Sequence, residues 1–141
     1  MSARLEHANI AVRDVDQIVR FIRTALPDYA VRGEGTSNGR RWVHVGDDES
    51  YLAINQASRD PAEAWVPYAG KPGVNHLGFE VDDAAALGER LRAAGYTEST
   101  VANRHPYRQR VYFLDPEGND WEFVQYDSDV PAERNDYALD G

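Results

Sequence analysis

The sequence predicts an α+β domain built from two tandem copies of one module, each with the order strand, helix and three strands. Three observations lead to this prediction. The chain matches itself at an offset of 69 residues, the separation of His7 from His76, which aligns residues 5–12 with 74–81. Both aligned segments alternate in the way expected of a strand with one buried face. Each is followed by an aspartate and then by apolar residues at helical spacing.

The first module covers residues 5–56 and begins with the strand at 5–12. Asp14 is the expected N-cap of the following helix, and Pro27 is expected to end it. A strand near residues 29–33 leads into a turn at 35–39 that is rich in Gly, Ser and Asn. Strands at 41–45 and 51–55 complete the module.

The second module covers residues 74–126 and repeats this order. Its first strand is 74–81, its helix runs from about 83 to 94, and Gly95 is the expected C-cap. Its remaining strands are expected at 97–102, 108–114 and 121–126. Residues 57–73 form a connector that contains Pro61, Pro67 and Pro72, and residues 127–141 are a polar tail expected to lie over the surface.

Composition limits the classes of function. At 141 residues and 42% apolar content, the chain fits one compact domain. A net charge of −9 argues against nucleic acid and anionic membranes as partners, because basic surface supplies the affinity for both. The absence of cysteine excludes disulfides and thiolate chemistry. No signal sequence or membrane-length apolar run is present, so we expect a soluble, cytoplasmic protein.

The strand alternation predicts a sheet face with unusual chemistry. In several strands the residues that point away from the helices are polar, aromatic or histidine. We call this the open face, and a concave sheet around a ligand cavity would need such a lining. Its expected members are His7, Trp42, His44, Tyr51, Asn55, His76, Arg108, Arg110, Tyr112, Glu122 and Tyr126.

Three of these residues predict a metal site. His7 and His76 occupy the same position of the repeat, and Glu122 lies in the last strand of the second module. The first module has Ala53 at the position of Glu122. Two imidazoles and one carboxylate form a facial triad that holds a divalent metal and leaves coordination positions free. A metal with open positions serves catalysis.

These motifs resemble the vicinal-oxygen-chelate superfamily, which includes glyoxalase I, bleomycin-resistance proteins, fosfomycin thiol transferases and extradiol dioxygenases. The resemblance spans about residues 5–126 and depends on the two histidine strands and on residues 112–122, a strand, an Asp-Pro-x-Gly turn and a second strand. It implies paired βαβββ modules that form an open, cupped mixed sheet with helices on the convex side. It also implies a homodimer, with His7 of one subunit near His76 and Glu122 of the other.

The extradiol dioxygenase signature is matched in order by seven residues: His105, Val111, Tyr112, Asp115, Pro116, Gly118 and Glu122. In that family the matching His and Tyr line the substrate pocket and the Glu binds iron. The chain departs from it by lacking the main acid–base histidine near Ala53, where His44 is the nearest substitute.

Two other members of the superfamily fit less well. Glyoxalase I takes a fourth ligand, Glu or Gln, from the position that Ala53 occupies in this chain, and alanine cannot serve as a ligand. Only a small shift in register would bring Asn55 or Gln56 to that position. The thiol transferases share Tyr112 but carry basic and serine residues where this chain has Ala102 and Pro106. Arg104, Arg108 and Arg110 are basic residues that either bind an anionic substrate group or protect an edge strand by their charge.

The sequence therefore predicts a metal-dependent enzyme, most similar to an extradiol-type dioxygenase, that acts on a small molecule with adjacent oxygens. A glyoxalase-like lyase, a thiol transferase and a non-catalytic binding protein are the alternatives. Fe²⁺ is the expected metal, with Mn²⁺, Ni²⁺ and Zn²⁺ as the other candidates. Tyr112, His105 and His44 are the candidate catalytic groups. The candidate substrate-binding residues are Arg108, Arg110, Asn9, Tyr51, Asn55, Trp42 and Tyr126.

Overall fold

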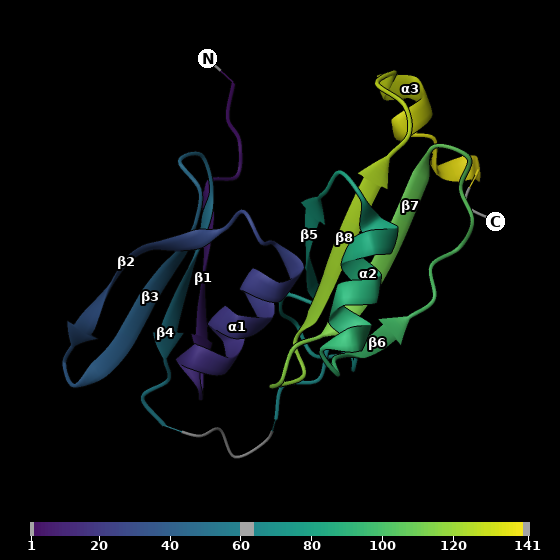
Figure 1. Cartoon of the computed structure of the whole chain (residues 1–141). Helices are drawn as coiled ribbons and strands as arrows, with labels where there is room; N and C mark the ends of the chain where they lie inside the picture. The colour runs from purple at the N-terminus through teal and green to yellow at the C-terminus, as the bar shows by residue number, and fades with distance from the viewer. Residues whose placement is uncertain (1, 60–63, 140–141) are drawn as a thin grey trace. The chain divides into compact units, whose positions relative to one another are not determined.

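The computed structural model describes residues 2–59 and 64–139, and it confirms the α+β fold of two βαβββ modules (Figure 1). The chain divides into two compact units, Met1–Ala64 and Trp65–Gly141. Each unit contains its own four-stranded mixed sheet. One long helix packs on a single face of each sheet and leaves the other face open.

Unit 1 has the strand order β1-β4-β3-β2, with β1 parallel to β4 and the other pairs antiparallel. Its elements are β1 (His7–Val12), α1 (Val15–Ala25), β2 (Ala30–Ser37), β3 (Arg40–Gly46) and β4 (Tyr51–Gln56). Apolar residues of β3 and β4, including Val43, Leu52 and Ile54, are buried with Ile18 and Phe21 of α1. Their burial fixes which face of the sheet stays open.

Unit 2 has the equivalent order β5-β8-β7-β6. Its elements are β5 (His76–Glu80), α2 (Ala84–Ala93), β6 (Thr97–Thr100), β7 (Arg108–Leu114) and β8 (Asp120–Tyr126). The parallel pairs of the two units have the same register, since Asn9 pairs with Ala53 and Gly78 pairs with Glu122. The sequence repeat is therefore a structural repeat at the level of single residues.

The predicted N-cap of the first helix is confirmed, and the second helix has an equivalent N-cap, Asp83. The Asp14 side chain accepts a hydrogen bond from the Gln17 amide at 3.1 Å, and the Asp83 side chain accepts one from the Ala86 amide at 2.9 Å. These carboxylates satisfy amide groups that have no partner within the helix. The C-cap of α2 is Ala94, one residue before the predicted Gly95, which follows with a φ of 90°, a conformation that glycine adopts without steric cost.

The second strand of unit 1 is longer than predicted. The turn is confined to Asn38 and Gly39, with φ of 52° and 75°, so residues 35–37 of the predicted turn belong to β2. Gly35 has a packing role in this strand. A Cβ on Gly35 would lie 2.9 Å from Cζ2 of Trp42, so glycine makes room for the indole ring.

Other boundaries differ by a few residues. β1 begins at His7, two residues later than predicted, and β6 ends at Thr100 instead of residue 102. Residues 60–63 of the predicted connector, including Pro61, lie outside the described part of the chain. In residues 2–59 and 64–139, no helix is long and apolar enough to cross a membrane.

The C-terminal segment forms two short helices, α3 (Pro131–Arg134) and a 3₁₀ helix, η1 (Tyr137–Leu139). It is attached to unit 2 by specific contacts. Arg134 Nη2 lies 3.1 Å from Glu80 Oε1, and the same guanidinium lies 4.0 Å from the ring centre of Tyr126. These contacts fold the segment over one end of the β5-β8-β7 sheet.

Candidate functional site

The open face of unit 2 brings together three of the predicted site residues. Glu122 of β8 lies opposite Gly78 of β5 on one side and Tyr112 of β7 on the other. His76 Nε2 lies 3.0 Å from Glu122 Oε2. The Tyr112 hydroxyl donates a hydrogen bond to Glu122 Oε1 at 3.0 Å. Each carboxylate oxygen of Glu122 therefore has a separate partner, and the side chain is held in one orientation.

The environment of Tyr112 raises the pKa of its hydroxyl to about 12. Burial is the largest cause, followed by the negative charge of Glu122 and the hydrogen bond to it. Arg110 acts in the opposite direction through its positive charge and a hydrogen bond. Tyr112 is therefore a neutral phenol at physiological pH and can serve as a hydrogen-bond donor.

The loop before β5 supplies a residue that sequence analysis did not identify. The Tyr68 hydroxyl forms a hydrogen bond with His76 Nδ1. Tyr68 has a φ of 62°, which costs a non-glycine residue on the order of 1 kcal/mol. Its amide donates to the Asn75 side chain at 2.8 Å, and this bond holds the loop in place. Burial, then the charges of Asp120 and Glu122 and a hydrogen bond with Asp120, raise the pKa of Tyr68.

A buried aspartate fixes the turn that leads into β8. Asp115 Oδ1 accepts hydrogen bonds from the amides of Glu117 at 2.8 Å and Asn119 at 3.0 Å. Asp115 Oδ2 accepts from the Asn119 side chain at 2.9 Å and from the Trp121 indole at 3.0 Å. Because Trp121 is held on the helix side of the strand, Glu122 must point to the open face.

The open face of unit 1 carries a row of rings. The His7 ring stacks on Tyr51 with ring centres 4.7 Å apart and planes 10° apart. His44 lies 4.9 Å from Tyr51, and Trp42 lies 5.0 Å from His44. The guanidinium of Arg32, which the sequence analysis did not single out, lies 4.3 Å from the centre of the Tyr51 ring.

His7 itself has one ring nitrogen engaged, because its Nδ1 lies 2.8 Å from Glu6 Oε1. Beside it, Asn55 Nδ2 donates to Asn9 Oδ1 at 2.7 Å. Ala53 pairs with Asn9 and with His44, so it lies on the open face although it is only 2% exposed. This register excludes the shift that would have put Asn55 or Gln56 at the position equivalent to Glu122.

Two candidate residues are held by the C-terminal segment. His105 Nε2 lies 2.8 Å from the carbonyl oxygen of Asp136, and its Nδ1 accepts the Tyr107 amide at 3.0 Å. Both ring nitrogens of this buried histidine are therefore engaged in hydrogen bonds within the fold, which argues against proton transfer by His105. Arg108 donates to the same Asp136 carbonyl at 3.5 Å and lies 5.2 Å from the Tyr137 ring centre.

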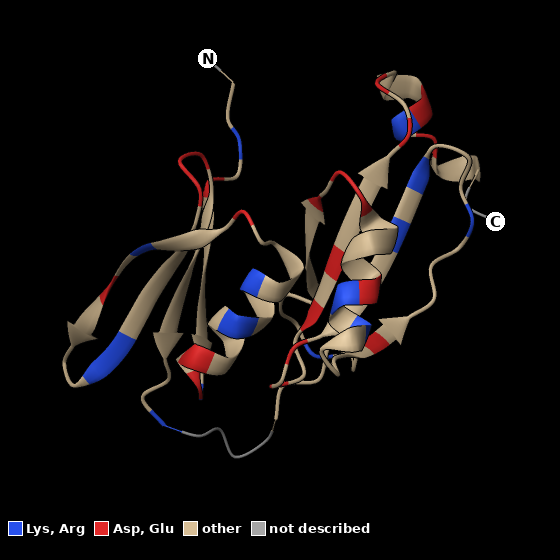
Figure 2. Cartoon of the chain, in the orientation of Figure 1, with Lys and Arg blue, Asp and Glu red and all other residues tan. Residues whose placement is uncertain are grey.

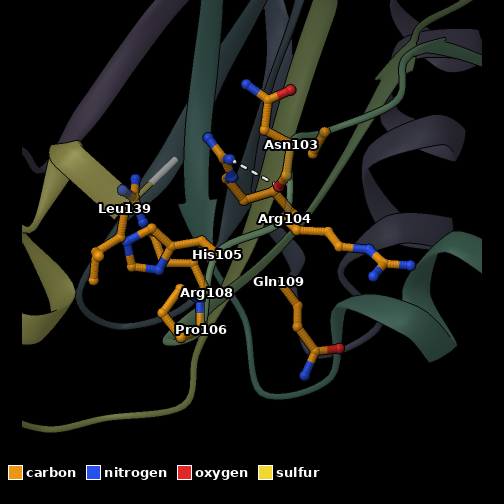
Figure 3. Close-up of a pocket in the computed structure, with 9 residues that line it drawn as sticks. Asn103, Arg104, His105, Pro106, Arg108, Gln109 and Leu139 are labelled. Carbon is orange, nitrogen blue, oxygen red and sulfur yellow. Dashed lines mark hydrogen bonds between the residues drawn. The ribbon is translucent and has the colours of Figure 1, made fainter. Parts of the chain in front are cut away.

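A basic pocket lies beside β7. The basic residues of β7 lie at the end of the strand near the C-terminal segment (Figure 2). It has a volume of about 620 Å³, and its lining includes Arg104, Arg108 and Arg110. Arg104 and Gln109 extend on one side, with His105, Arg108 and Leu139 on the other (Figure 3). Arg110 Nη2 donates to the Asn103 carbonyl at 3.2 Å. Among the described residues, no carboxylate lines this pocket.

Each unit by itself contributes only part of the predicted triad, because His7 belongs to unit 1 and His76 and Glu122 belong to unit 2. Within the described residues, no three His, Asp or Glu side chains are grouped in a way that could hold a metal ion. Tyr68 and Glu6, which contact the two histidines, were missed because neither follows a periodic pattern. The adjacency of Glu6 to His7 is the one signal in the sequence that pointed to such a contact.

Comparison with known proteins identifies the family. The model of the Glyoxalase/Bleomycin resistance protein/Dioxygenase superfamily matches residues 4–123, and the chain belongs to this superfamily. The superfamily contains metal-dependent enzymes. No functionally curated protein sequence matches the chain significantly.

Solved structures share the fold over nearly the whole chain. A glyoxalase/bleomycin resistance protein/dioxygenase domain from Frankia sp. EAN1pec is 22% identical with a TM-score of 0.71, and the match covers 89% of this chain and 99% of that one. UcmS2 is 27% identical with a TM-score of 0.63, covering 91% and 100%. A variant of the fosfomycin resistance protein FosX from Listeria monocytogenes, in complex with Mn(II) and 1S,2S-dihydroxypropylphosphonic acid, is 16% identical with a TM-score of 0.70, covering 95% and 98%.

Proposed function

We propose that the protein is a divalent-metal-dependent enzyme that binds a small molecule through two adjacent oxygens. His7, His76 and Glu122 are the proposed metal ligands. The observation that carries this proposal is that the two repeat-related histidines, His7 and His76, have the same ring nitrogen engaged by a side chain. In each, Nδ1 is engaged by a neighbouring side chain, Glu6 or Tyr68. Metal-binding histidines generally have their second nitrogen held in this way.

The donor atoms in unit 2 fit a metal ion. The 3.0 Å between His76 Nε2 and Glu122 Oε2 is a normal separation for two ligands of one ion, each bonded at about 2.1 Å. Gly78 keeps the adjacent space open, because a Cβ there would lie 3.4 Å from Glu122 Oε2. Imidazole and carboxylate ligands suit Fe²⁺, which we propose first, and also Mn²⁺, the ion found with FosX.

A bound metal with open positions would act as a Lewis acid on the two substrate oxygens. Around it, the single O–H of the neutral Tyr112 holds Glu122 in place, and during the reaction it would turn from Glu122 to developing negative charge on the substrate. His44, on the open face of unit 1, is the proposed proton carrier, since His105 is engaged in packing. Arg110, which contacts Tyr112 and lines the basic pocket, is the proposed partner of an anionic substrate group.

We propose an extradiol-type dioxygenase reaction first, because residues 105–122 follow that signature and because Ala53 cannot serve as the fourth ligand or proton shuttle of a glyoxalase. Metal analysis of protein purified without chelator, compared with His76→Ala, tests the metal site. Oxygen uptake on catechols tests the reaction. Unchanged metal content in His76→Ala would refute the ligand assignment.

A binding protein without catalysis is the second candidate, and the row of rings in unit 1 is the observation that favours it. His7 stacks on Tyr51, while His44 is tilted by 30° to Tyr51 and Trp42 by 54° to His44, so the row offers several aromatic faces that can hold a planar ligand by stacking. Metal-replete protein that binds substrate analogues and turns over none of them would favour this function over the enzyme.

A further inference from the structure

We propose that Tyr68 is a positioning residue for His76 and that, together with Asp120, it determines which imidazole nitrogen faces the metal. This inference rests on the metal site proposed above. It concerns a tyrosine in the loop before β5, outside every predicted strand and helix. Tyr68 touches the proposed ligand His76 and does not itself belong to the proposed ligand set.

The first step of the argument is the arrangement of hydrogen bonds around the His76 ring. Glu122 Oε2 faces Nε2 at 3.0 Å, and the Tyr68 hydroxyl faces Nδ1. A carboxylate oxygen only accepts hydrogen bonds, so without a metal Nε2 carries the proton and Nδ1 accepts from the Tyr68 hydroxyl. The imidazole is then held at both nitrogens and cannot rotate away from Glu122.

The second step is what happens when a metal takes Nε2. The ring proton then resides on Nδ1, which becomes a donor and needs an acceptor. A phenol hydroxyl can fill this role, because it both donates and accepts. When Tyr68 accepts from Nδ1, its own proton requires an acceptor. We assign this role to the carboxylate of Asp120, which lies opposite His76 in the β5-β8 register and acts on the Tyr68 hydroxyl by its charge.

The third step is the support for this chain of contacts. Asp120 pairs with His76 in the β5-β8 register, is 6% exposed, and accepts a hydrogen bond from the Ser99 hydroxyl at 2.5 Å. Tyr68 is fixed by its backbone, since its amide donates to Asn75, the residue immediately before His76. The proposed chain therefore consists of the Asp120 carboxylate, the Tyr68 hydroxyl and the His76 imidazole, all three in unit 2.

The test uses the full-length protein and Mn²⁺ as the probe. Tyr68→Phe removes the hydroxyl oxygen and keeps both the aromatic ring and the hydrogen bond from the backbone amide to the Asn75 side chain. Loss of such a supporting contact typically lowers metal affinity about 10- to 100-fold. Tyr29→Phe, which also removes a hydrogen-bonded hydroxyl, 2.8 Å from Ser50 Oγ, is the matched control and should change the affinity less than about twofold. Asp120→Asn should weaken Mn²⁺ binding in the same direction, and its effect should not add to that of Tyr68→Phe.

A second readout needs no metal and no activity. In metal-free protein, the ¹⁵N resonance of His76 Nδ1 should move in Tyr68→Phe towards that of an imidazole nitrogen exposed to water, while the resonances of His44 and His105 stay in place. A purely structural role for Tyr68 would not single out this nitrogen. Circular dichroism verifies that the variant is folded.

The outcomes separate this inference from the proposed function. Wild-type protein that binds no Mn²⁺ while the Nδ1 resonance still responds would refute the proposed metal site. Wild-type protein that binds Mn²⁺, loses it in His76→Ala and keeps full affinity in Tyr68→Phe would overturn the role of Tyr68. An unchanged Nδ1 resonance in Tyr68→Phe would overturn it as well.

Discussion

The buried carboxylate of Asp115 should stabilise unit 2 by more than any surface aspartate, and Asp115→Ala measures this contribution. The side chain is 5% exposed and accepts four hydrogen bonds, from two amides, one side-chain amide and the Trp121 indole. Loss of the carboxylate removes the acceptor of the buried indole N–H, at about 1–3 kcal/mol. The three half-buried bonds from Glu117 and Asn119 add about 0.5–1 kcal/mol each. We therefore expect a loss of about 3–5 kcal/mol.

Urea denaturation followed by circular dichroism measures the change in the free energy of unfolding. Asp127→Ala is the matched control, because Asp127 also accepts from two side chains, Gln109 at 3.0 Å and Gln125 at 2.8 Å, but in exposed positions. Its removal should cost less than about 1 kcal/mol. An Asp115→Ala protein that loses no more stability than this control would refute the reasoning from burial.

Three further predictions follow from the site and from the C-terminal segment. If the metal site is shared between two subunits, mixing His7→Ala with Glu122→Ala protein should restore half of the metal capacity, and no recovery after verified subunit exchange would place all ligands on one chain. Ala53→Glu should tighten Mn²⁺ binding, as measured by equilibrium dialysis, because the new carboxylate stands at the repeat position of Glu122; weaker binding would contradict this register argument. The hydrogen bonds from Ser128 and then Tyr107 lower the pKa of Glu133 below 4.5, so their contribution to stability is present above pH 4.5 and is lost as the pH falls through the lowered value. Amide chemical shifts of residues 128–136 should therefore move in that acidic range, and constant shifts would show that Glu133 does not anchor the segment.

The fold could be predicted from the sequence because its signals are local and repeated. Strand β7 was predicted with its observed bounds, Arg108–Leu114, and the N-cap Asp14 was identified. The error in β2 has a physical reason. Gly35 looks like a turn residue, yet it lies in a strand where the Trp42 ring needs the space that a side chain would fill.

The site could be predicted only in part. The pairing of His76 with Glu122 follows from the alternation of two strands and from the repeat. The contacts of Tyr68 and of the C-terminal segment depend on chain reversals that no periodic pattern encodes. His105 illustrates the consequence: it fits a catalytic signature, but its two nitrogens are engaged by Tyr107 and Asp136, one of them a residue far along the chain.

The matched registers of Asn9 with Ala53 and of Gly78 with Glu122 also have an evolutionary consequence. Two of the four alanine codons become glutamate codons by a single base change at the second position. One half of the duplicated scaffold therefore stands a point mutation away from an additional carboxylate, with no strand pairing disturbed. In descendants of such a chain, a single codon change can therefore alter the number of metal ligands. The residues that selection preserves for folding are not affected by this change.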